Sequence, residues 1–239
     1  RHIFIEKPIT TTLEDADQLI RIADLRNLTL QVGHIERFNG AVRSLEGMTL
    51  KPGFVESHRL ASFDPRGTDV SVVHDLMIHD IDLIRHLVRS EITKIDATGV
   101  AVISDQIDIA NARLQFENGC VANVTASRIS LKKMRKMRLF QRDAYIALDF
   151  LAGKSEVYRL LDGDAPVKPG SFAIPVNTGD GRSHKILREA PPAEDQEQLK
   201  LELESFIHAV KSGEAPPVTG QDGREALRVS LEIIDRIEK

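Results

Sequence analysis

The first 33 residues carry a strand, a helix and a second strand, and this pattern restricts the fold more than any other feature. Residues 2–5 are β-branched and aromatic, and Pro8 ends the strand because it lacks a backbone donor. Thr12 then caps a helix that keeps apolar spacing as far as Asn27, a residue that tolerates the left-handed stop. A second strand follows over 28–33. This order forms a right-handed βαβ unit, so the two strands are expected to be parallel.

This unit is only part of a dinucleotide-binding sheet. A complete domain of that kind has further βαβ units and a Gly-x-Gly-x-x-Gly turn after its first strand. Glycines with that spacing do not occur in the sequence. The chain also opens with Arg1 directly on strand-like residues, so we expect the glycine-rich half to precede residue 1.

The pattern of the remaining chain predicts a second, larger domain. Residues 92–159 contain short strands at hairpin spacing, which is typical of an antiparallel sheet. Residues 162–193 are rich in Gly, Pro and Asp and are expected to form loops with one further strand near 185–188. Other predicted elements are a strand over 54–60 and helices over 37–45, 71–88, 194–212 and 222–239.

The predicted fold class is therefore α/β followed by α+β. Residues 1–34 are assigned to the remnant of a Rossmann dinucleotide-binding domain, and residues 35–239 to a substrate-binding and oligomerisation domain. The second domain is expected to hold a large open, mostly antiparallel sheet with helices on one face.

Composition restricts the partners and the compartment. A net charge of -4 provides no cationic field for a phosphate backbone, so nucleic acid is not expected as a partner. The basic cluster over 132–138 alternates with apolar residues, which favours a half-solvated strand over an anion site. A single cysteine, Cys120, fits a reducing compartment, and cytoplasm is the expected location. Since no apolar run approaches about 18 residues, we expect no membrane partner.

The helix predicted over 71–88 has one polar stripe opposite its apolar arc. Asp75, His79, Asp82 and His86 fall at helical spacing along that stripe. His79 is a candidate general base because imidazole titrates near neutrality, and Asp75 one turn away can orient it. The alternative is an ordinary ion pair on a helix surface. No metal site is expected, because a metal needs at least three convergent ligands.

Lys7 stands at the carboxyl end of the first strand, beside a proline that stiffens the turn. Open α/β sheets bind ligands at that edge, so a fixed ammonium there can polarise a hydroxyl or carbonyl group. Taken alone, a lysine after a strand is usually an exposed surface residue.

Three motifs in this order resemble the signature of the Gfo/Idh/MocA oxidoreductases. They are Ile5-Glu6-Lys7-Pro8-Ile9, Arg37-Phe38-Asn39 and Asp75-x-x-x-His79-Asp80. The resemblance implies that Lys7, Asp75 and His79 surround the reacting carbinol of a sugar. It also implies that the nicotinamide of NAD or NADP lies beside the corner formed by Glu6, Lys7 and Pro8, and that the Lys7-Pro8 bond is a candidate for cis.

Two longer stretches, 33–39 and 71–84, resemble bacterial dehydrogenases that oxidise C3 of UDP-N-acetylglucosamine. A small sugar or nucleotide sugar is therefore the expected substrate. Arginine forks match phosphate oxygens, and the expected substrate-binding residues are Arg37, Asn39, Arg59 and Arg66.

Two alternatives to a dehydrogenase stay open at this point. The chain can be a sugar-binding or assembly module that performs no redox step, or a lyase that uses a hydride transiently and returns its cofactor. In each case a homodimer or homotetramer through the outer sheet face is expected, because Val100, Val102, Ile103 and Ile107 are too apolar for a wet surface.

Overall fold

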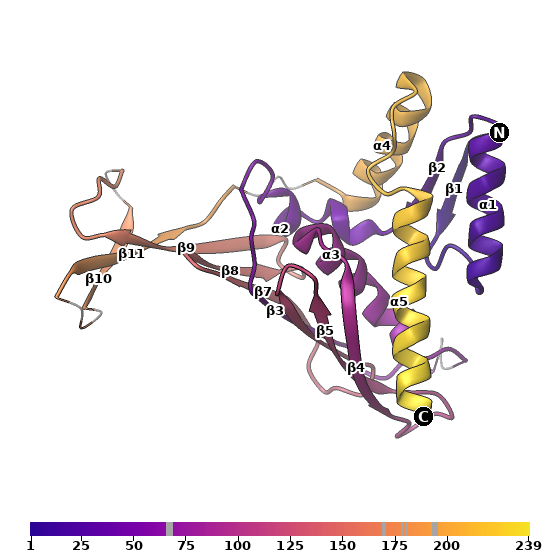
Figure 1. Ribbon diagram of the computed structural model, residues 1–239, viewed down its shortest axis with the longest axis horizontal. Helices are drawn as coiled ribbons and strands as arrows, with labels where there is room; N and C mark the ends of the chain where they lie inside the picture. The colour runs from indigo at the N-terminus through magenta and orange to yellow at the C-terminus, as the bar shows by residue number, and fades with distance from the viewer. Residues whose placement is uncertain (66–68, 169–170, 178, 180, 193–195) are drawn as a thin grey trace.

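The computed structural model consists of a small parallel layer, a long twisted sheet and helices packed between them (Figure 1). It describes residues 1–65, 69–168, 171–177, 179, 181–192 and 196–239. None of the described helices is long and apolar enough to cross a membrane.

The N-terminal layer confirms the predicted βαβ unit. Strand β1 (Ile3–Glu6) pairs in parallel with β2 (Leu30–Gly33), and α1 (Leu13–Leu25) connects them. Thr12 caps α1 by accepting a hydrogen bond from the Asp15 amide at 3.2 Å. Asn27 adopts the left-handed conformation after the helix, with φ of 51°. Both carboxyl ends of the strands, at Lys7 and His34, therefore lie at one edge of this layer.

The second sheet has nine strands in the order β10-β11-β9-β8-β7-β3-β6-β5-β4. Every neighbouring pair is antiparallel except β3 with β6, which confirms the predicted open and mostly antiparallel sheet. The strands are β3 (Phe54–Leu60), β4 (Ile92–Val100), β5 (Ile109–Phe116), β6 (Val121–Ser127), β7 (Met134–Gln141), β8 (Ala144–Asp149), β9 (Lys154–Asp162), β10 (Phe172–Asn177) and β11 (Ser183–Glu189).

The sequence prediction was wrong in two regions. The segment predicted as loops with one strand holds a hairpin of two strands, β10 and β11, which extends the sheet far from the helices (Figure 1). The single helix predicted over 37–45 is instead a 3-10 turn, η1 (Ile35–Phe38), followed by α2 (Gly40–Arg43). The Asn39 side chain separates them by capping α2 through the Ala41 amide at 3.0 Å.

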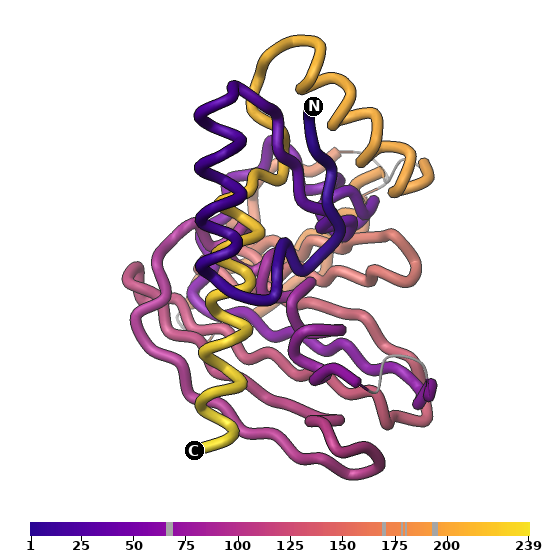
Figure 2. Tube along the Cα trace, turned by 90° about the vertical axis from the view of Figure 1, so that its right-hand side faces the viewer, coloured from indigo at the N-terminus to yellow at the C-terminus, as the bar shows by residue number. Residues whose placement is uncertain are grey.

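Helices cover one face of the large sheet. Alternate residues of the central strands point inward and form the main core with α3 (Ile78–Val88) and α5 (Gly220–Glu238). Figure 2 shows α5 running from the N-terminal layer along the large sheet. Helix α4 (Gln198–Ser212) packs on η1 and reaches β2, where Gln31 donates to the Ser205 hydroxyl at 3.2 Å. These helices hold the two layers together.

The opposite, outer face of the sheet carries stacked rings and ion pairs. Phe54, Phe140, Tyr145 and Tyr158 occupy adjacent positions across four strands, with ring centroids 5.0 to 5.8 Å apart. The Lys/Arg cluster over 132–138 lies partly in β7, where most basic residues face solvent, as the half-solvated interpretation predicted.

Gly223 of α5 lies against β2 and leaves no space for a side chain. A Cβ atom there would come 2.7 Å from Val32 Cγ2 and 3.1 Å from Val32 Cβ. Gly→Ala normally stabilises a helix interior by about 1 kcal/mol. Because Val32 is fully buried, we expect Gly223→Ala instead to destabilise the protein by about 1–3 kcal/mol. Urea unfolding measures this, with Gln221→Ala at an exposed position of the same helix as the control. A stabilised Gly223→Ala variant would contradict the packing.

Candidate active site

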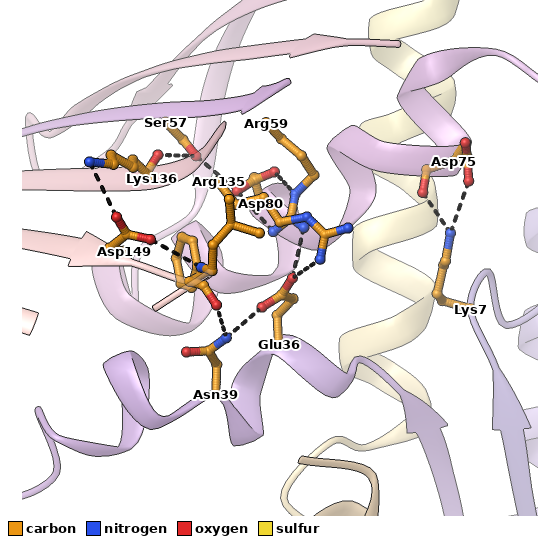
Figure 3. Close-up of polar contacts among 12 residues, drawn as sticks. Lys7, Glu36, Asn39, Ser57, Arg59, Asp75, Asp80, Arg135, Lys136 and Asp149 are labelled. Carbon is orange, nitrogen blue, oxygen red and sulfur yellow. Dashed lines mark hydrogen bonds and ion pairs between the residues drawn. The ribbon is translucent and has the colours of Figure 1, made fainter. Parts of the chain in front are cut away.

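Lys7 meets Asp75 at the edge where the parallel strands end. The Lys7 Nζ atom donates to the Asp75 carbonyl oxygen at 2.6 Å and lies 3.7 Å from Asp75 Oδ1 (Figure 3). The Lys7-Pro8 peptide bond is cis, as the sequence analysis expected. Burial lowers the pKa of the Lys7 ammonium, and the negative charge of Asp75 partly offsets this effect. Asp75 thereby fixes the ammonium beside the helical segment that begins at Val73. There the ammonium is a good hydrogen-bond donor to the oxygen of a ligand.

The helix that carries Asp75 begins with a π-turn. The predicted helix over 71–88 consists of η2 (Val73–Met77), which has π geometry, followed by α3. A π-turn holds one more residue per turn than an α-helix, and such turns are frequent at functional sites. Here the widened turn contains Asp75, whose carbonyl accepts from Lys7.

His79 lies one turn beyond Asp75 and is half-buried. Its Nδ1 atom is buried and has no hydrogen-bond partner among the residues described. Burial holds the pKa of the His79 imidazole well below its ordinary value of 6.5, and the positive charges of Arg59 and Lys7 act in the same direction. The ring is therefore neutral at pH 7 and has a lone pair available for a proton. The expected hydrogen bond from Asp75 to this ring is not present.

Two further imidazoles reach this edge, and the sequence analysis did not single them out. His34 directly follows β2 and is 1% exposed, and His74 precedes Asp75 in the π-turn. Burial lowers the pKa of each ring, and the charge of Lys7 contributes in both cases. The position of His34 in the sequence could have indicated it as a site residue. His34 follows β2 and Lys7 follows β1, and neighbouring parallel strands end at the same edge of a sheet.

Arg59, which the sequence analysis expected to bind substrate, is part of a buried ion network (Figure 3). Its Nε atom donates to Asp80 Oδ2 at 2.6 Å, and Nη1 donates to Glu36 Oε1 at 2.7 Å. Asp80 also accepts from the Ser57 hydroxyl at 2.8 Å. Since Arg59 is 2% exposed and both acids are buried, this guanidinium belongs to the scaffold. Asp80 is thereby bonded to two side chains of β3 and is part of the same scaffold.

Asn39 and Arg37 are likewise occupied by partners inside the chain. The Asn39 amide donates to Glu36 and to the Phe150 carbonyl, at 3.1 and 3.0 Å. Arg37 binds Asp82 through two hydrogen bonds of 2.7 and 2.5 Å, and its Nη2 lies 3.2 Å from Asp222. Bonds within the chain hold the polar atoms of both residues in this structure, and their expected contact with substrate stays a prediction. Arg66, the fourth expected substrate residue, lies outside the described residues.

The predicted polar stripe is thus divided between separate surroundings. Asp75 faces Lys7, whereas Asp82 is 2% exposed and His86 Nδ1 lies 3.4 Å from Arg37 Nη1. Arg37 and His86 also line a cavity of about 700 Å³ between α2, α4 and the end of α3, whose lining includes neither Lys7 nor His79. Within the described ranges, no cluster of three or more His, Cys, Asp and Glu side chains is placed to hold a metal ion.

Comparison with known proteins places this geometry in a family. The model of the oxidoreductase family with an NAD-binding Rossmann fold matches residues 1–34, and the model of the GFO/IDH/MocA C-terminal domain matches residues 37–146. The UDP-N-acetylglucosamine 3-dehydrogenase of Acidithiobacillus ferrooxidans is 35% identical over 238 residues, which are 99% of this chain and 71% of that protein. A myo-inositol 2-dehydrogenase of Thermotoga maritima is 25% identical over 95% of this chain and 67% of its own length.

Solved structures agree with these relationships. A structure of the Acidithiobacillus ferrooxidans enzyme superposes with a TM-score of 0.86, covering 99% of this chain and 71% of the other. A levoglucosan dehydrogenase in complex with NADH and L-sorbose shares the fold, with a TM-score of 0.78 at 17% identity, over 100% of this chain and 71% of the other. This chain therefore belongs to the Gfo/Idh/MocA family of NAD(P)-dependent oxidoreductases.

Proposed function

We propose that this protein oxidises a sugar carbinol to a ketone, with C3 of a nucleotide sugar such as UDP-N-acetylglucosamine as the reacting carbon. The observation that carries the proposal is the Lys7 ammonium, fixed on Asp75 at the ligand-binding edge of a parallel sheet, with a neutral His79 on the next turn. The 35% identity to a UDP-N-acetylglucosamine 3-dehydrogenase supports the choice of substrate.

The residues at this edge fit a nicotinamide and a sugar. His34, His74 and His79 all have buried ring nitrogens without a partner in the described chain, and such groups are costly unless a ligand or water satisfies them. The carboxamide group of a nicotinamide and the hydroxyl groups of a sugar can both donate and accept hydrogen bonds, so they can satisfy these imidazole nitrogens. Glu6, Lys7 and Pro8 form the corner that would hold the nicotinamide ring.

NAD(P) supplies the hydride acceptor when it is bound, and the side chains do the remaining chemistry. His79 accepts the hydroxyl proton, so the O–H bond breaks as an N–H bond forms. Lys7 donates a hydrogen bond to the same oxygen and stabilises its developing negative charge. Asp75 holds Lys7 in place through its carbonyl and carboxylate oxygens.

Calorimetric titration with NAD+ and absorbance at 340 nm with UDP-N-acetylglucosamine test this proposal. Saturable binding followed by NADH formation is the expected result. Product without net NADH would instead identify a lyase that returns its cofactor. Sugar binding without saturable NAD+ binding would indicate a sugar-binding or assembly module that performs no redox step.

The outer face of the large sheet is the proposed contact between copies of the chain. At the end of β4, Val100, Val102 and Ile103 are 55 to 57% exposed, and the outer strands add Leu160, Phe172 and Ile174 at 45 to 59%. Ile107, named with the first group, is instead partly buried against the core. We expect a dimer or tetramer by sedimentation at micromolar concentration, because such apolar area is seldom left in water. Only monomer under those conditions would remove this proposal.

A further inference from the structure

The cavity of about 700 Å³ between α2, α4 and the end of α3 is separate from the candidate active site. Neither Lys7 nor His79 is among the residues that line it. Its volume falls in the range of about 300–1,000 Å³ that is usual for pockets that bind small molecules. Much of its wall is apolar and consists of Leu45, Met48, Leu50, Leu87 and Leu201. The cavity is therefore large enough, and apolar enough, to enclose part of an organic molecule.

The charged groups on the wall of this cavity are mostly cationic. Arg37, Arg43 and Arg89 all line it, and Glu46, whose side chain is 73% exposed, is the only acid among the described residues that do. Glu46 Oε1 lies 3.6 Å from Arg43 Nε, and two hydrogen bonds join Arg37 to Asp82. Arg89 forms no ion pair within the part of the chain that the structure describes. The wall therefore carries positive charge that the protein itself does not balance.

Arg89 has a backbone conformation that is unusual for a residue with a side chain. It ends α3 with φ of 52° and ψ of 46°, in the left-handed region where helices commonly end on glycine. Non-glycine residues in this region are uncommon and cluster at functional sites. The Arg89 Nε atom donates to the His86 carbonyl oxygen at 3.4 Å, and its backbone amide donates to the Arg85 carbonyl at 3.0 Å. Arg89 thereby covers two carbonyl oxygens at the negative end of the α3 dipole.

His86 adds a hydrogen-bond donor to this wall. Its Nδ1 atom lies 3.4 Å from Arg37 Nη1, and because a guanidinium group only donates, Nδ1 is the acceptor of this hydrogen bond. Burial lowers the pKa of the His86 imidazole, and the positive charge of Arg37 acts in the same direction, so the ring is neutral at pH 7. A neutral ring that accepts at Nδ1 carries its hydrogen on Nε2. A ligand beside these imidazole and guanidinium groups therefore has to supply the acceptors.

We propose that this cavity is a second ligand site, which binds a small organic anion with a carboxylate or phosphate group and an apolar body. The anionic group binds Arg43, Arg89 and the His86 N–H, since hydrogen bonds between charged groups are the strongest that this wall can form. The apolar body contacts the leucines and Met48 and is removed from water there. The inference does not rest on the proposed function, because the cavity lies apart from Lys7 and His79.

Calorimetric titration of the full chain with octanoate, octyl phosphate, 1-octanol and inorganic phosphate tests this site. 1-Octanol keeps the apolar body without the charge, and inorganic phosphate keeps the charge without the apolar body. We expect saturable binding of one molecule of octanoate or octyl phosphate per chain, at least about 10-fold tighter than that of 1-octanol or inorganic phosphate. The tighter of the two anions identifies carboxylate or phosphate as the group that the cavity takes.

Three substitutions locate the binding. Arg89→Asn removes the guanidinium but keeps the left-handed helix end, which asparagine tolerates, and Arg43→Gln removes the second cation. Each should weaken binding of the anion about 10-fold, the usual effect of losing a hydrogen bond to a charged group, and leave 1-octanol unchanged. Thr49→Trp fills the cavity from an exposed position and should weaken binding of every probe that enters it. Arg138→Gln, at an exposed arginine of the outer sheet face, and Lys7→Met, in the candidate active site, should bind like the wild type.

Four results would overturn the proposal. The first is no saturable binding of either anion at millimolar concentrations. The second is 1-octanol that binds as tightly as octanoate, which would identify an apolar pocket without an anion site. The third is inorganic phosphate that binds as tightly as octyl phosphate, which would show that the apolar wall plays no part. The fourth is anion binding that Thr49→Trp and the two arginine variants leave unchanged, or that Lys7→Met removes, which would place the anion elsewhere. Circular dichroism checks that each variant is folded, and the Thr49→Trp comparison depends on neither arginine.

Discussion

His79→Asn is expected to lower turnover by roughly 10²–10⁴ in the enzyme with its dinucleotide-binding domain complete, because that is the usual worth of a positioned base. Asparagine keeps the size and polarity of the ring, so the fold and NAD+ binding should be unchanged. Steady-state kinetics and calorimetry measure the two effects separately. His208→Asn, at an exposed histidine, should behave like the wild type.

The pH profile gives a second test of the same residue. Only neutral His79 accepts a proton, and burial places its pKa well below 6.5. The wild-type rate should therefore be flat near neutrality and fall as the pH drops through that lowered pKa. In His79→Asn this acidic limb should be missing. A variant with near wild-type kcat and the same limb would show that the imidazole is structural.

Lys7→Met should be about as inactive as His79→Asn, for a different reason. The fixed ammonium stabilises charge that develops on the reacting oxygen, so its loss should appear in kcat more than in binding. Asp75→Asn should be intermediate, because the Asp75 carbonyl still accepts from Lys7 when the carboxylate charge is removed. Equal losses in all three variants would contradict these separate roles.

Arg59→Met is expected to have the largest effect on stability, a loss of about 3–5 kcal/mol. The substitution leaves Asp80 buried at 1% exposure without its cation, and it leaves Glu36, at 5% exposure, with only Arg135 at 3.7 Å. Urea unfolding followed by circular dichroism gives the free energy of unfolding. The same change removes a positive charge that lowers the pKa of His79, so the acidic limb of the rate profile should move to higher pH.

Arg138→Met is the matched control, since Arg138 pairs with Glu56 on the outer face and its side chain is 44% exposed. An exposed pair contributes about 0–1 kcal/mol, so this variant should unfold almost like the wild type. If Arg59→Met loses no more than Arg138→Met, the buried network does not hold β3 to α3.

The sequence predicted those elements whose signals are local. Thr12 and Asn27 mark the ends of α1, and β3 was predicted with its observed bounds because its residues alternate between the two faces. Strand β10 was missed because Pro175 interrupts it. A proline is tolerated in a strand only where its missing N–H is not needed, and β10 is an edge strand of the sheet. Edge position is a property of the whole sheet and is not visible in the segment itself.

The candidate site was predictable to the same extent. The position of Lys7 could be predicted because the strand ends of a parallel layer meet at one edge, and the family motif implied that Asp75 lies in the same site. The partners of Arg37 and Arg59 were not predictable, since pairing with Asp82 and Asp80 depends on how η1 and β3 pack against α3. An unpaired arginine and a buried paired one look alike in a sequence.

The π-turn at Val73–Met77 makes the site sensitive to the length of the chain. This turn sets the angle around the helix axis between Asp75 and the two acids of α3. Asp75 faces Lys7, whereas Asp80 faces Arg59 and Asp82 faces Arg37. Deleting any one residue from this turn would restore a regular α-helix. Either Asp75 would then turn away from Lys7, or the acids of α3 would turn away from Arg59 and Arg37. Insertions and deletions should therefore be tolerated in the hairpin loops of the large sheet and selected against within these five residues as the protein diverges.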